Sequence, residues 1–233
     1  MIMRRFVIGD IHGAYKALEQ CLQRCGFDDD KDLLIALGDL CDGWPETCQV
    51  VERLRNIKNI HFILGNHDYW TMEWGMTGIA DPAWLNVGGE NTMKSYEGDT
   101  MPAPHLEFFD AAKLYLELDD KLFVHAGIKP GIPLEQQSPD IFMWDRSLFQ
   151  EAMNRYQMGH PQKLTGYDEV YIGHSPIHRL GFTKPLFTGG IWLMDTGAGW
   201  EGVLSIMDID TKEVYSSNRV DTLYPPGSGR QRY

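Results

Sequence analysis

Several features that would assign a chain to a common class are missing from this sequence. No apolar run approaches the roughly 18 residues that a membrane-spanning helix needs, which excludes such a helix. No internal repeat or low-complexity tract is present. The 4 cysteines show no Cys-x-x-Cys spacing, so a zinc ribbon is not expected and buried free thiols are. These cysteines are Cys21, Cys25, Cys41 and Cys48.

Positive charge is also scarce. The chain has 21 Lys and Arg residues against 33 Asp and Glu residues, a formal net charge of −12. Such a surface repels nucleic acid and acidic membranes, so neither is expected as a partner. The 233 residues, 43% of them hydrophobic, fit a single α/β domain over residues 1–233. The first apolar run ends at Asp10 instead of extending into a signal sequence, and a cytoplasmic location is therefore expected.

Five short polar clusters are what the sequence has instead. Their side chains are Asp, His and Asn, a mixture of oxygen and nitrogen donors that suits a divalent ion such as Mn, Fe or Zn. One cluster alone is also typical of a turn, a helix cap or a buried histidine, but five together favour a metal centre. In order they are Gly9-Asp-Ile-His-Gly13, Gly38-Asp-Leu-Cys-Asp42, Gly65-Asn-His-Asp68, His125-Ala-Gly127 and Gly173-His174.

Each cluster follows a predicted strand. Loops after the carboxyl ends of strands can converge at one edge of a sheet, so these polar groups can meet. Helical spacing predicts crossover helices over residues 14–25 and 45–55, and antiparallel hairpins are expected over residues 115–125 and after Lys184. The pattern predicts a mixed sheet with helices outside it. Apolar runs of strand length cover residues 4–8, 33–37, 61–64, 122–124, 170–172 and 191–194.

Two segments lack this alternation. Residues 69–105 are rich in Trp, Gly, Met and Pro, and we expect an irregular cap over the site. Trp70, Trp74 and Trp84 in that segment either line a substrate groove or pack in a small core of their own. Residues 224–233 have no apolar periodicity and are expected to form a loose tail.

The clusters, in this order, resemble the calcineurin-like metallophosphoesterases, and among them the branch that contains bacterial and phage serine/threonine protein phosphatases. The resemblance spans about residues 1–208. The segments Met143-Trp-Asp-Arg146 and Asp195-Thr-Gly-Ala198 look like bacterial protein phosphatases and symmetrical dinucleoside tetraphosphatases. The resemblance implies a four-layer αββα sandwich of two mixed sheets, whereas spacing and composition by themselves predict only an α/β fold with a mixed sheet.

The resemblance also implies a set of metal ligands. Asp10, His12 and Asp39 would bind a first divalent ion, and Asp39 has two oxygens with which to bridge to a second. Asn66 would use its amide oxygen, because an amide nitrogen is no donor to a cation, and it is also expected to contact substrate. Manganese is expected, and Fe, Zn, Ni or Co would suit the same donors. The implied ligands of the second ion are Asp39, Asn66, His125 and His174.

Such a centre hydrolyses phosphate esters. Two ions about 3.5 to 4 Å apart supply hydroxide at neutral pH and neutralise charge on the transferring oxygens. His67 is the predicted general acid for the leaving oxygen, and Asp42 is the carboxylate that orients it. Asp195 is expected to position a ligand.

One position departs from the family pattern. The second motif of the family normally runs Gly-Asp-x-Val-Asp-Arg-Gly, so Gly43 stands where a phosphate-binding Arg is expected. Arg146 matches a second phosphate-contacting Arg of bacterial relatives and is the predicted replacement, with a surface ion pair to Asp145 as the alternative. The other candidates considered are Arg53, Arg155 and Arg179.

Three functions follow from these patterns. The first is a protein phosphatase-like enzyme that acts on phosphoproteins or small phosphate esters. The second keeps the centre but cleaves dinucleoside tetraphosphates, an interpretation motivated by His125-Ala-Gly-Ile128 and Trp144-Asp-Arg146. The third is a metal-binding interaction protein in which catalysis faded when the arginine was lost at Gly43. The sequence predicts no oligomeric state.

Overall fold

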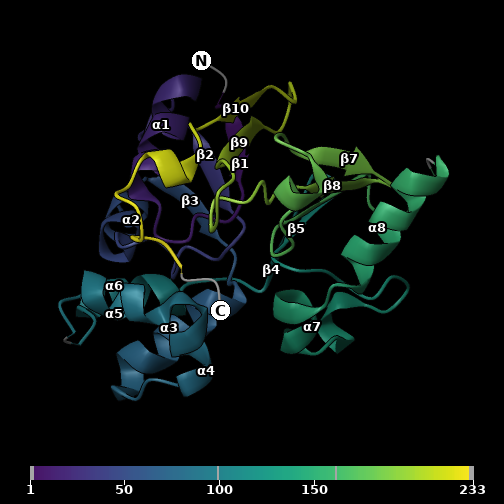
Figure 1. Cartoon of the computed structure of the whole chain (residues 1–233). Coiled ribbons are helices and arrows are strands. Elements are labelled where there is room, and N and C mark those ends of the chain that lie inside the picture. The colour runs from purple at the N-terminus through teal and green to yellow at the C-terminus, as the bar shows by residue number, and fades with distance from the viewer. Residues whose placement is uncertain (1–2, 99, 161, 231–233) are drawn as a thin grey trace.

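Two five-stranded sheets form the centre of the computed structural model, which describes residues 3–98, 100–160 and 162–230 (Figure 1). The first sheet has the order β10-β9-β1-β2-β3, and the second has the order β4-β5-β6-β8-β7. The strands of the first sheet are β1 (Arg5–Ile8), β2 (Leu33–Ala36), β3 (Asn59–Phe62), β9 (Ser205–Asp208) and β10 (Val214–Ser216). Those of the second are β4 (Tyr115–Leu118), β5 (Lys121–Val124), β6 (Glu169–Ile172), β7 (Leu186–Thr188) and β8 (Ile191–Leu193).

Both sheets are mixed, and their parallel strands end together. In the first sheet β1, β2 and β3 are parallel, while β9 and β10 are antiparallel to their neighbours. In the second, β5, β6 and β8 are parallel, and the β4–β5 and β7–β8 pairs are antiparallel. The expected hairpins and mixed sheets are therefore confirmed. The parallel register brings the carboxyl ends of six strands to one edge of the paired sheets.

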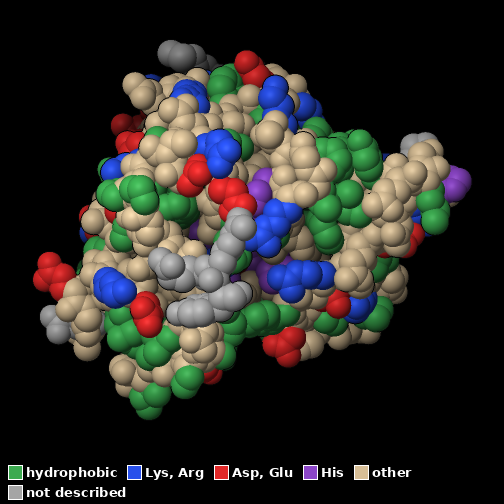
Figure 2. Space-filling view, in the orientation of Figure 1, with side chains coloured by type: hydrophobic (Ala, Val, Ile, Leu, Met, Phe, Trp, Pro, Cys, Tyr) green, Lys and Arg blue, Asp and Glu red, His purple; other side chains and the backbone are tan. Residues whose placement is uncertain are grey.

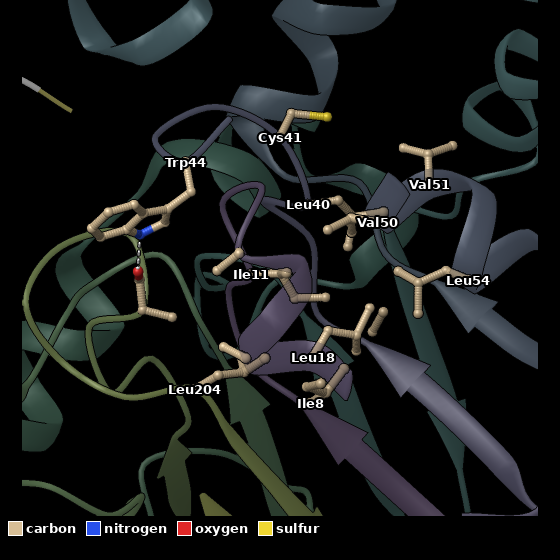
Figure 3. Packing of buried hydrophobic residues seen from close by; sticks show 14 of the residues in the cluster. Ile8, Ile11, Leu18, Leu40, Cys41, Trp44, Val50, Val51, Leu54 and Leu204 are labelled. Atoms are coloured by element: carbon tan, nitrogen blue, oxygen red, sulfur yellow. Dashed lines mark hydrogen bonds between the residues drawn. The ribbon is translucent and has the colours of Figure 1, made fainter. Parts of the chain in front are cut away.

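The sheets face each other across an apolar layer and carry helices on their outer sides, as expected. Val7, Ile35 and Met207 of the first sheet meet Phe123 and Tyr171 of the second in this layer. The first sheet is covered by α1 (Tyr15–Cys25) and α2 (Thr47–Arg55), and the second by α7 (Pro139–Trp144) and α8 (Ser147–Met158) (Figure 1). Figure 3 shows the packing of α1 and α2 on the first sheet.

The two crossover helices begin close to their predicted starts. Helix α1 buries Leu18, Cys21 and Cys25 on one face and ends at Gly26, whose φ of 61° allows the closing turn. Helix α2 begins two residues after Pro45, which lies outside its first turn. All four thiols are free, and only that of Cys48 is not fully buried.

Residues 69–105 are more regular than expected. They contain most of α3 (Asn66–Thr77), then α4 (Pro82–Trp84), a π-type turn at Leu85–Gly89, α5 (Glu90–Ser95) and the start of α6 (Ala103–Asp110). The expectation of an irregular segment is therefore wrong. Trp74 and Trp84 are buried against each other, with 5.7 Å between ring centroids. Trp70 instead contacts the rings of His67 and Trp144.

The segment 224–230 has no regular secondary structure but is packed against the first half of the chain. Tyr224 is buried, and its ring stacks on Trp44 with 4.9 Å between centroids. The expectation of a loose tail does not hold for these residues, and residues 231–233 of that prediction lie outside the described residues. Within the described ranges, no helix has both the length and the apolar character needed to cross a bilayer.

The layer between the sheets predicts a large stability effect at its centre. Phe123 is fully buried and stacks on Tyr171 with 4.6 Å between ring centroids. We expect Phe123→Ala to lower the free energy of unfolding by about 3 to 5 kcal/mol in a urea titration. Ile79→Ala is the control, because Ile79 is 75% exposed and should change stability by less than about 0.5 kcal/mol. Equal effects of the two substitutions would contradict this account.

Candidate metal centre

The polar clusters converge at the edge where the parallel strands end. Asp10 and His12 follow β1, Asp39 follows β2, and Asn66 opens α3 after β3. His125 follows β5, and His174 follows β6 of the second sheet. The side chains of all six are buried. The structure thus brings together every residue that the sequence predicted as a metal ligand.

Asp39 lies at the centre of this group. Its Oδ2 atom is 3.7 Å from His12 Nε2, whereas its Oδ1 atom is 3.4 Å from His125 Nε2. Donor atoms of His12, Asp39 and His67 lie within 4.8 Å of one another, and so do those of Asp39, His125 and His174. The two oxygens of one carboxylate therefore face two separate groups of donors.

Asp10 and Asn66 complete the two groups. Asp10 Oδ2 is 3.9 Å from His12 Nε2, and its carboxylate accepts the backbone N–H of His174 at 2.9 Å. Asn66 Oδ1 is 3.1 Å from His125 Nε2. The first group contains His67 as well, which we predicted as an acid and not as a ligand.

Four residues of the site have a positive backbone φ, which residues other than glycine rarely adopt. His12, Asp39, Asp42 and His174 have φ values of 51°, 50°, 69° and 63°. Such left-handed residues cost on the order of 1 to 3 kcal/mol each and persist only where the surroundings impose them. Here the N–H groups of Ile11 and His12 both bond to Asp39 O, at 3.0 and 2.9 Å. Strain of this kind concentrates at functional sites.

Three glycines allow the backbone to approach the donor side chains. A Cβ atom on Gly173 would lie 2.1 Å from Asp10 Oδ1, and one on Gly65 would lie 2.3 Å from Asp39 Oδ1. A Cβ atom on Gly199 would lie 2.3 Å from His12 Cδ2. Gly199 follows none of the five clusters, and sequence reasoning did not assign it to the site.

Backbone carbonyl groups orient two of the imidazoles. His125 Nδ1 lies 2.8 Å from Leu37 O, and His12 Nδ1 lies 2.9 Å from Cys41 O. A carbonyl at Nδ1 fixes the tautomer and leaves Nε2 to face the carboxylates as a lone-pair donor. His174 Nε2 is buried and has no hydrogen-bond partner among the described residues. A buried imidazole nitrogen without a hydrogen-bond partner is free to bind a metal ion.

Charge in the site is poorly balanced by the protein alone. Burial, followed by repulsion from Asp195 and Asp39, raises the pKa of Asp10 well above its usual range. Burial also raises the pKa of Asp195 to about 6. In contrast, burial lowers the pKa of His174 to about 3, which leaves that imidazole neutral. Crowded carboxylates beside imidazoles are a donor set that fits divalent cations.

His67 and Asp42 form the predicted pair. His67 Nδ1 is 2.6 Å from Asp42 Oδ2. Asp42 Oδ2 also accepts the indole N–H of Trp84 at 2.8 Å, and Asp42 Oδ1 accepts the hydroxyl of Thr92 at 2.7 Å. Residues of α4 and α5 thus fix the Asp42 carboxylate, and Asp42 in turn orients His67. Sequence reasoning had assigned this supporting role to neither Trp84 nor Thr92.

Asp68 is a further supporting residue that sequence reasoning missed. Its carboxylate accepts the backbone N–H of Leu40 at 2.8 Å and that of Gly65 at 3.1 Å. It therefore ties the loop after β2 to the loop after β3. Its position as the last residue of the third polar cluster could have indicated this role.

The candidate arginines differ in their surroundings. Arg146 is exposed and close enough to His174 to contribute to its low pKa. Asp145 pairs with Lys129 at 2.7 Å, and the described ion pairs include none between Asp145 and Arg146. Arg53 and Arg155 are engaged in ion pairs on the outer faces of α2 and α8.

An arginine that was not considered, Arg230, reaches the site from the carboxyl-terminal segment. Its Nη2 atom lies 3.0 Å from His12 Nδ1. The only signal for it in the sequence was Tyr224 followed by Pro225-Pro226-Gly227, an aromatic residue and a rigid turn in a segment otherwise without apolar periodicity.

Comparisons with known proteins agree with this geometry. The model of the calcineurin-like phosphoesterase family matches residues 3–198. Serine/threonine-protein phosphatase 1 of Salmonella typhimurium is 26% identical over 213 residues, which cover 88% of this chain and 91% of that protein. The symmetrical bis(5'-nucleosyl)-tetraphosphatase of Buchnera aphidicola is 30% identical over 135 residues, which cover 55% of this chain and 46% of that protein. A solved structure with the provisional name diadenosine tetraphosphatase has a TM-score of 0.68 at 18% identity, with 93% of each chain covered.

The close approach of Gly173 to Asp10 gives a test of the site. Because an added Cβ would displace the Asp10 carboxylate, we expect Gly173→Ala to weaken Mn²⁺ binding by about 10-fold to 100-fold in isothermal titration calorimetry. Gly166→Ala is the matched control, since nothing lies within 4 Å of a Cβ atom built there. Thermal melts should show that both variants remain folded. Unchanged Mn²⁺ affinity in Gly173→Ala would contradict the proposed donor set.

Proposed function

Since the chain belongs to the calcineurin-like phosphoesterase family and is a hydrolase of phosphate esters, we propose that it is a dinuclear metal-dependent phosphomonoesterase that acts most like a serine/threonine protein phosphatase. The observation that supports this most directly is Asp39, whose two oxygens face two separate groups of donors. Phosphorylated proteins or small phosphate esters are the proposed substrates. A cytoplasmic location is part of the proposal.

Six side chains would bind the two metal ions, and a seventh would act on the leaving group. Asp10, His12 and Asp39 would hold one ion, with Asp39 shared between the two. Bound divalent ions supply hydroxide at neutral pH and neutralise charge on the transferred phosphoryl group. We propose manganese, although Fe, Zn, Ni or Co would suit the same oxygen and nitrogen donors. The second ion would be held by Asp39, Asn66, His125 and His174, and His67 would serve the leaving group.

The surroundings of His67 support a role in proton delivery. Asp42 occupies its Nδ1 atom at 2.6 Å, so the proton available to a substrate is the one on Nε2. The rings of His67 and His12 are 5.0 Å apart, which puts this proton beside the first group of donors. Because Trp84 and Thr92 fix Asp42, the imidazole is held in one orientation before substrate arrives. We propose that it protonates the leaving oxygen. Asn66 and Arg146 are the proposed contacts to the phosphate.

The extent of the sequence match is the reason that we propose the protein phosphatase first, ahead of the dinucleoside tetraphosphatase. The match to the phosphatase relative covers 88% of this chain, whereas the match to the tetraphosphatase relative covers 55%. The tetraphosphatase stays a second candidate because its shared region is slightly more similar, at 30% identity. A metal-binding protein without catalysis is disfavoured, since it would have no need for a buried His67 and Asp42 pair.

The substrate class and the role of Asp39 can be tested together. We expect Mn²⁺-dependent hydrolysis of p-nitrophenyl phosphate and of a phosphoserine peptide, and a loss of more than about 10²-fold in Asp39→Asn, beyond what a residue that only orients a ligand costs. Asp119→Asn is the control, because that carboxylate lies on the surface. Full activity in Asp39→Asn would contradict the mechanism. Symmetrical cleavage of diadenosine tetraphosphate at higher kcat/KM than the peptide would select the second candidate.

The role of His67 predicts a dependence on the leaving group. A general acid contributes on the order of 10² to 10⁴ in rate, and it matters most when the leaving oxygen is basic. We expect His67→Asn to lower kcat far more for phenyl phosphate than for p-nitrophenyl phosphate, whose leaving group departs without protonation. The ratio of the two kcat values is the measurement. An equal loss on both substrates would mean that His67 is not the acid.

A further inference from the structure

The carboxyl-terminal segment delivers a guanidinium to the site from far along the chain. Arg230 Nη2 lies 3.0 Å from His12 Nδ1 and 3.6 Å from the point where a Cβ atom on Gly43 would be. A Cβ atom on Gly88 would lie 3.2 Å from Arg230 Nε. Because Gly43 and Gly88 have no side chain, there is room between them for the side chain of Arg230.

Several contacts fix the path of the segment. The ring of Tyr224 stacks on Trp44, and its hydroxyl donates to Glu46. Gly229 is pressed against the same indole, because a Cβ atom built on it would lie 2.9 Å from Trp44. Asn91 Nδ2 donates to Ser228 O at 3.1 Å. The segment just before Arg230 is therefore held at Tyr224, Ser228 and Gly229.

The Arg230 side chain itself is held by an aromatic ring. Its guanidinium lies 4.8 Å from the centroid of Trp200, and Arg179 lies 4.6 Å from the same centroid. Stacking of this kind orients a guanidinium without using its N–H groups. The orientation is thus set by Trp200, while the donors stay available for a ligand.

In the part of the chain that the structure describes, those donors have no adequate acceptor. His12 Nδ1 must carry a proton to donate to Cys41 O, so it cannot also accept an N–H from Arg230. Arg230 Nε is buried without a hydrogen-bond partner among the described residues. No carboxylate in the described part of the chain lies within ion-pair distance of Arg230, although Asp42, Asp39 and Asp195 act on its charge from further away. A buried guanidinium with an unpartnered N–H favours an anionic acceptor.

The surroundings of Arg230 are open to such an acceptor. A hollow of about 220 Å³ borders Arg230 and is lined by Trp44 and Trp200 and also by the carboxylates Glu201 and Asp221. A smaller hollow of about 110 Å³ borders both Arg230 and Gly88, and its lining includes Glu90 and Lys94. Figure 2 shows basic and histidine side chains together in the depression between the two halves of the molecule. The Nη2 atom of Arg230, 3.0 Å from His12 Nδ1, is the point at which the guanidinium borders the donor groups.

We propose that Arg230 is a phosphate-binding residue of the active site, and that its guanidinium takes the place left by the missing side chain at Gly43. The inference rests on the proposed phosphoesterase function. Planar N–H groups match the oxygens of a phosphoryl group in a bidentate manner. The contact strengthens as negative charge develops on those oxygens during hydrolysis. Arg146, the arginine expected from the sequence, is exposed and lies between α7 and α8, so the two arginines reach the site from different parts of the chain.

The test measures phosphate binding separately from turnover. Binding of inorganic phosphate to the Mn²⁺-loaded protein is followed by calorimetry, and kcat/KM is measured with p-nitrophenyl phosphate. We expect Arg230→Ala to lower kcat/KM on the order of 10²-fold to 10³-fold, with phosphate affinity reduced and Mn²⁺ affinity unchanged. Arg230→Lys should recover only part of both losses, because an ammonium cannot bind in a bidentate manner.

Two further variants sharpen the result. Arg55→Ala is the control, because Arg55 pairs with Glu52 at the end of α2, and it should leave both measurements unchanged. Tyr224→Ala, which removes the stacking on Trp44, should reproduce the loss seen in Arg230→Ala, although Tyr224 makes no contact with the donor groups. Unaltered phosphate binding in Arg230→Ala would overturn the inference. So would faster turnover, which would mean that the segment obstructs the site.

The readouts separate this inference from the proposed function. If the wild-type protein binds phosphate through Arg230 but hydrolyses none of the esters tested, the proposed function fails and the binding role of Arg230 stands. If it hydrolyses esters with Arg230→Ala as active as wild type, the proposed function stands and the inference fails. If the wild-type protein binds no phosphate with Mn²⁺ loaded, the inference fails as well.

Discussion

Five carboxylates buried at one edge of the paired sheets are the constraint that shapes the rest of the site. Asp10, Asp39, Asp42, Asp68 and Asp195 are all 4% exposed or less, and buried charges are costly unless they are paired or bound to cations. Each has its own partners. Asp10 accepts a backbone N–H, Asp39 lies between imidazoles, Asp42 accepts three side-chain donors, Asp68 accepts two backbone N–H groups, and Asp195 accepts the N–H of Gly197.

The cost of this arrangement is distributed over elements far apart in the chain. The left-handed backbone of His12, Asp39 and His174 is imposed by hydrogen bonds between loops of different strands. The apolar layer between the sheets holds those strands in register. Because the donors are fixed before any ion arrives, little reorganisation is needed when one binds. The fold acts as a rigid frame for a set of groups that would repel one another without it.

The strands and ligands could be predicted because the signal was local. Each polar cluster directly follows an apolar run, and the parallel strands end at one edge, so the positions of Asp10, Asp39 and His125 followed from spacing and resemblance. The helical nature of residues 69–105 was missed because it depends on the packing of Trp74, Trp84 and Tyr96, which is tertiary. The order of residues 224–230 was missed for the same reason, since it depends on Trp44, 180 positions from Tyr224 in the sequence.

The stack of Tyr224 on Trp44 has a consequence for how the enzyme would lose its activity. A segment held by a few contacts can detach at lower free energy than the sheets can unfold. Mild warming or dilute denaturant would then withdraw a cationic group while every metal donor kept its place. In this state the protein would remain folded with its metal ions bound, but it would bind substrate weakly because Arg230 is displaced. Inactivation would precede unfolding, and cooling would reverse it.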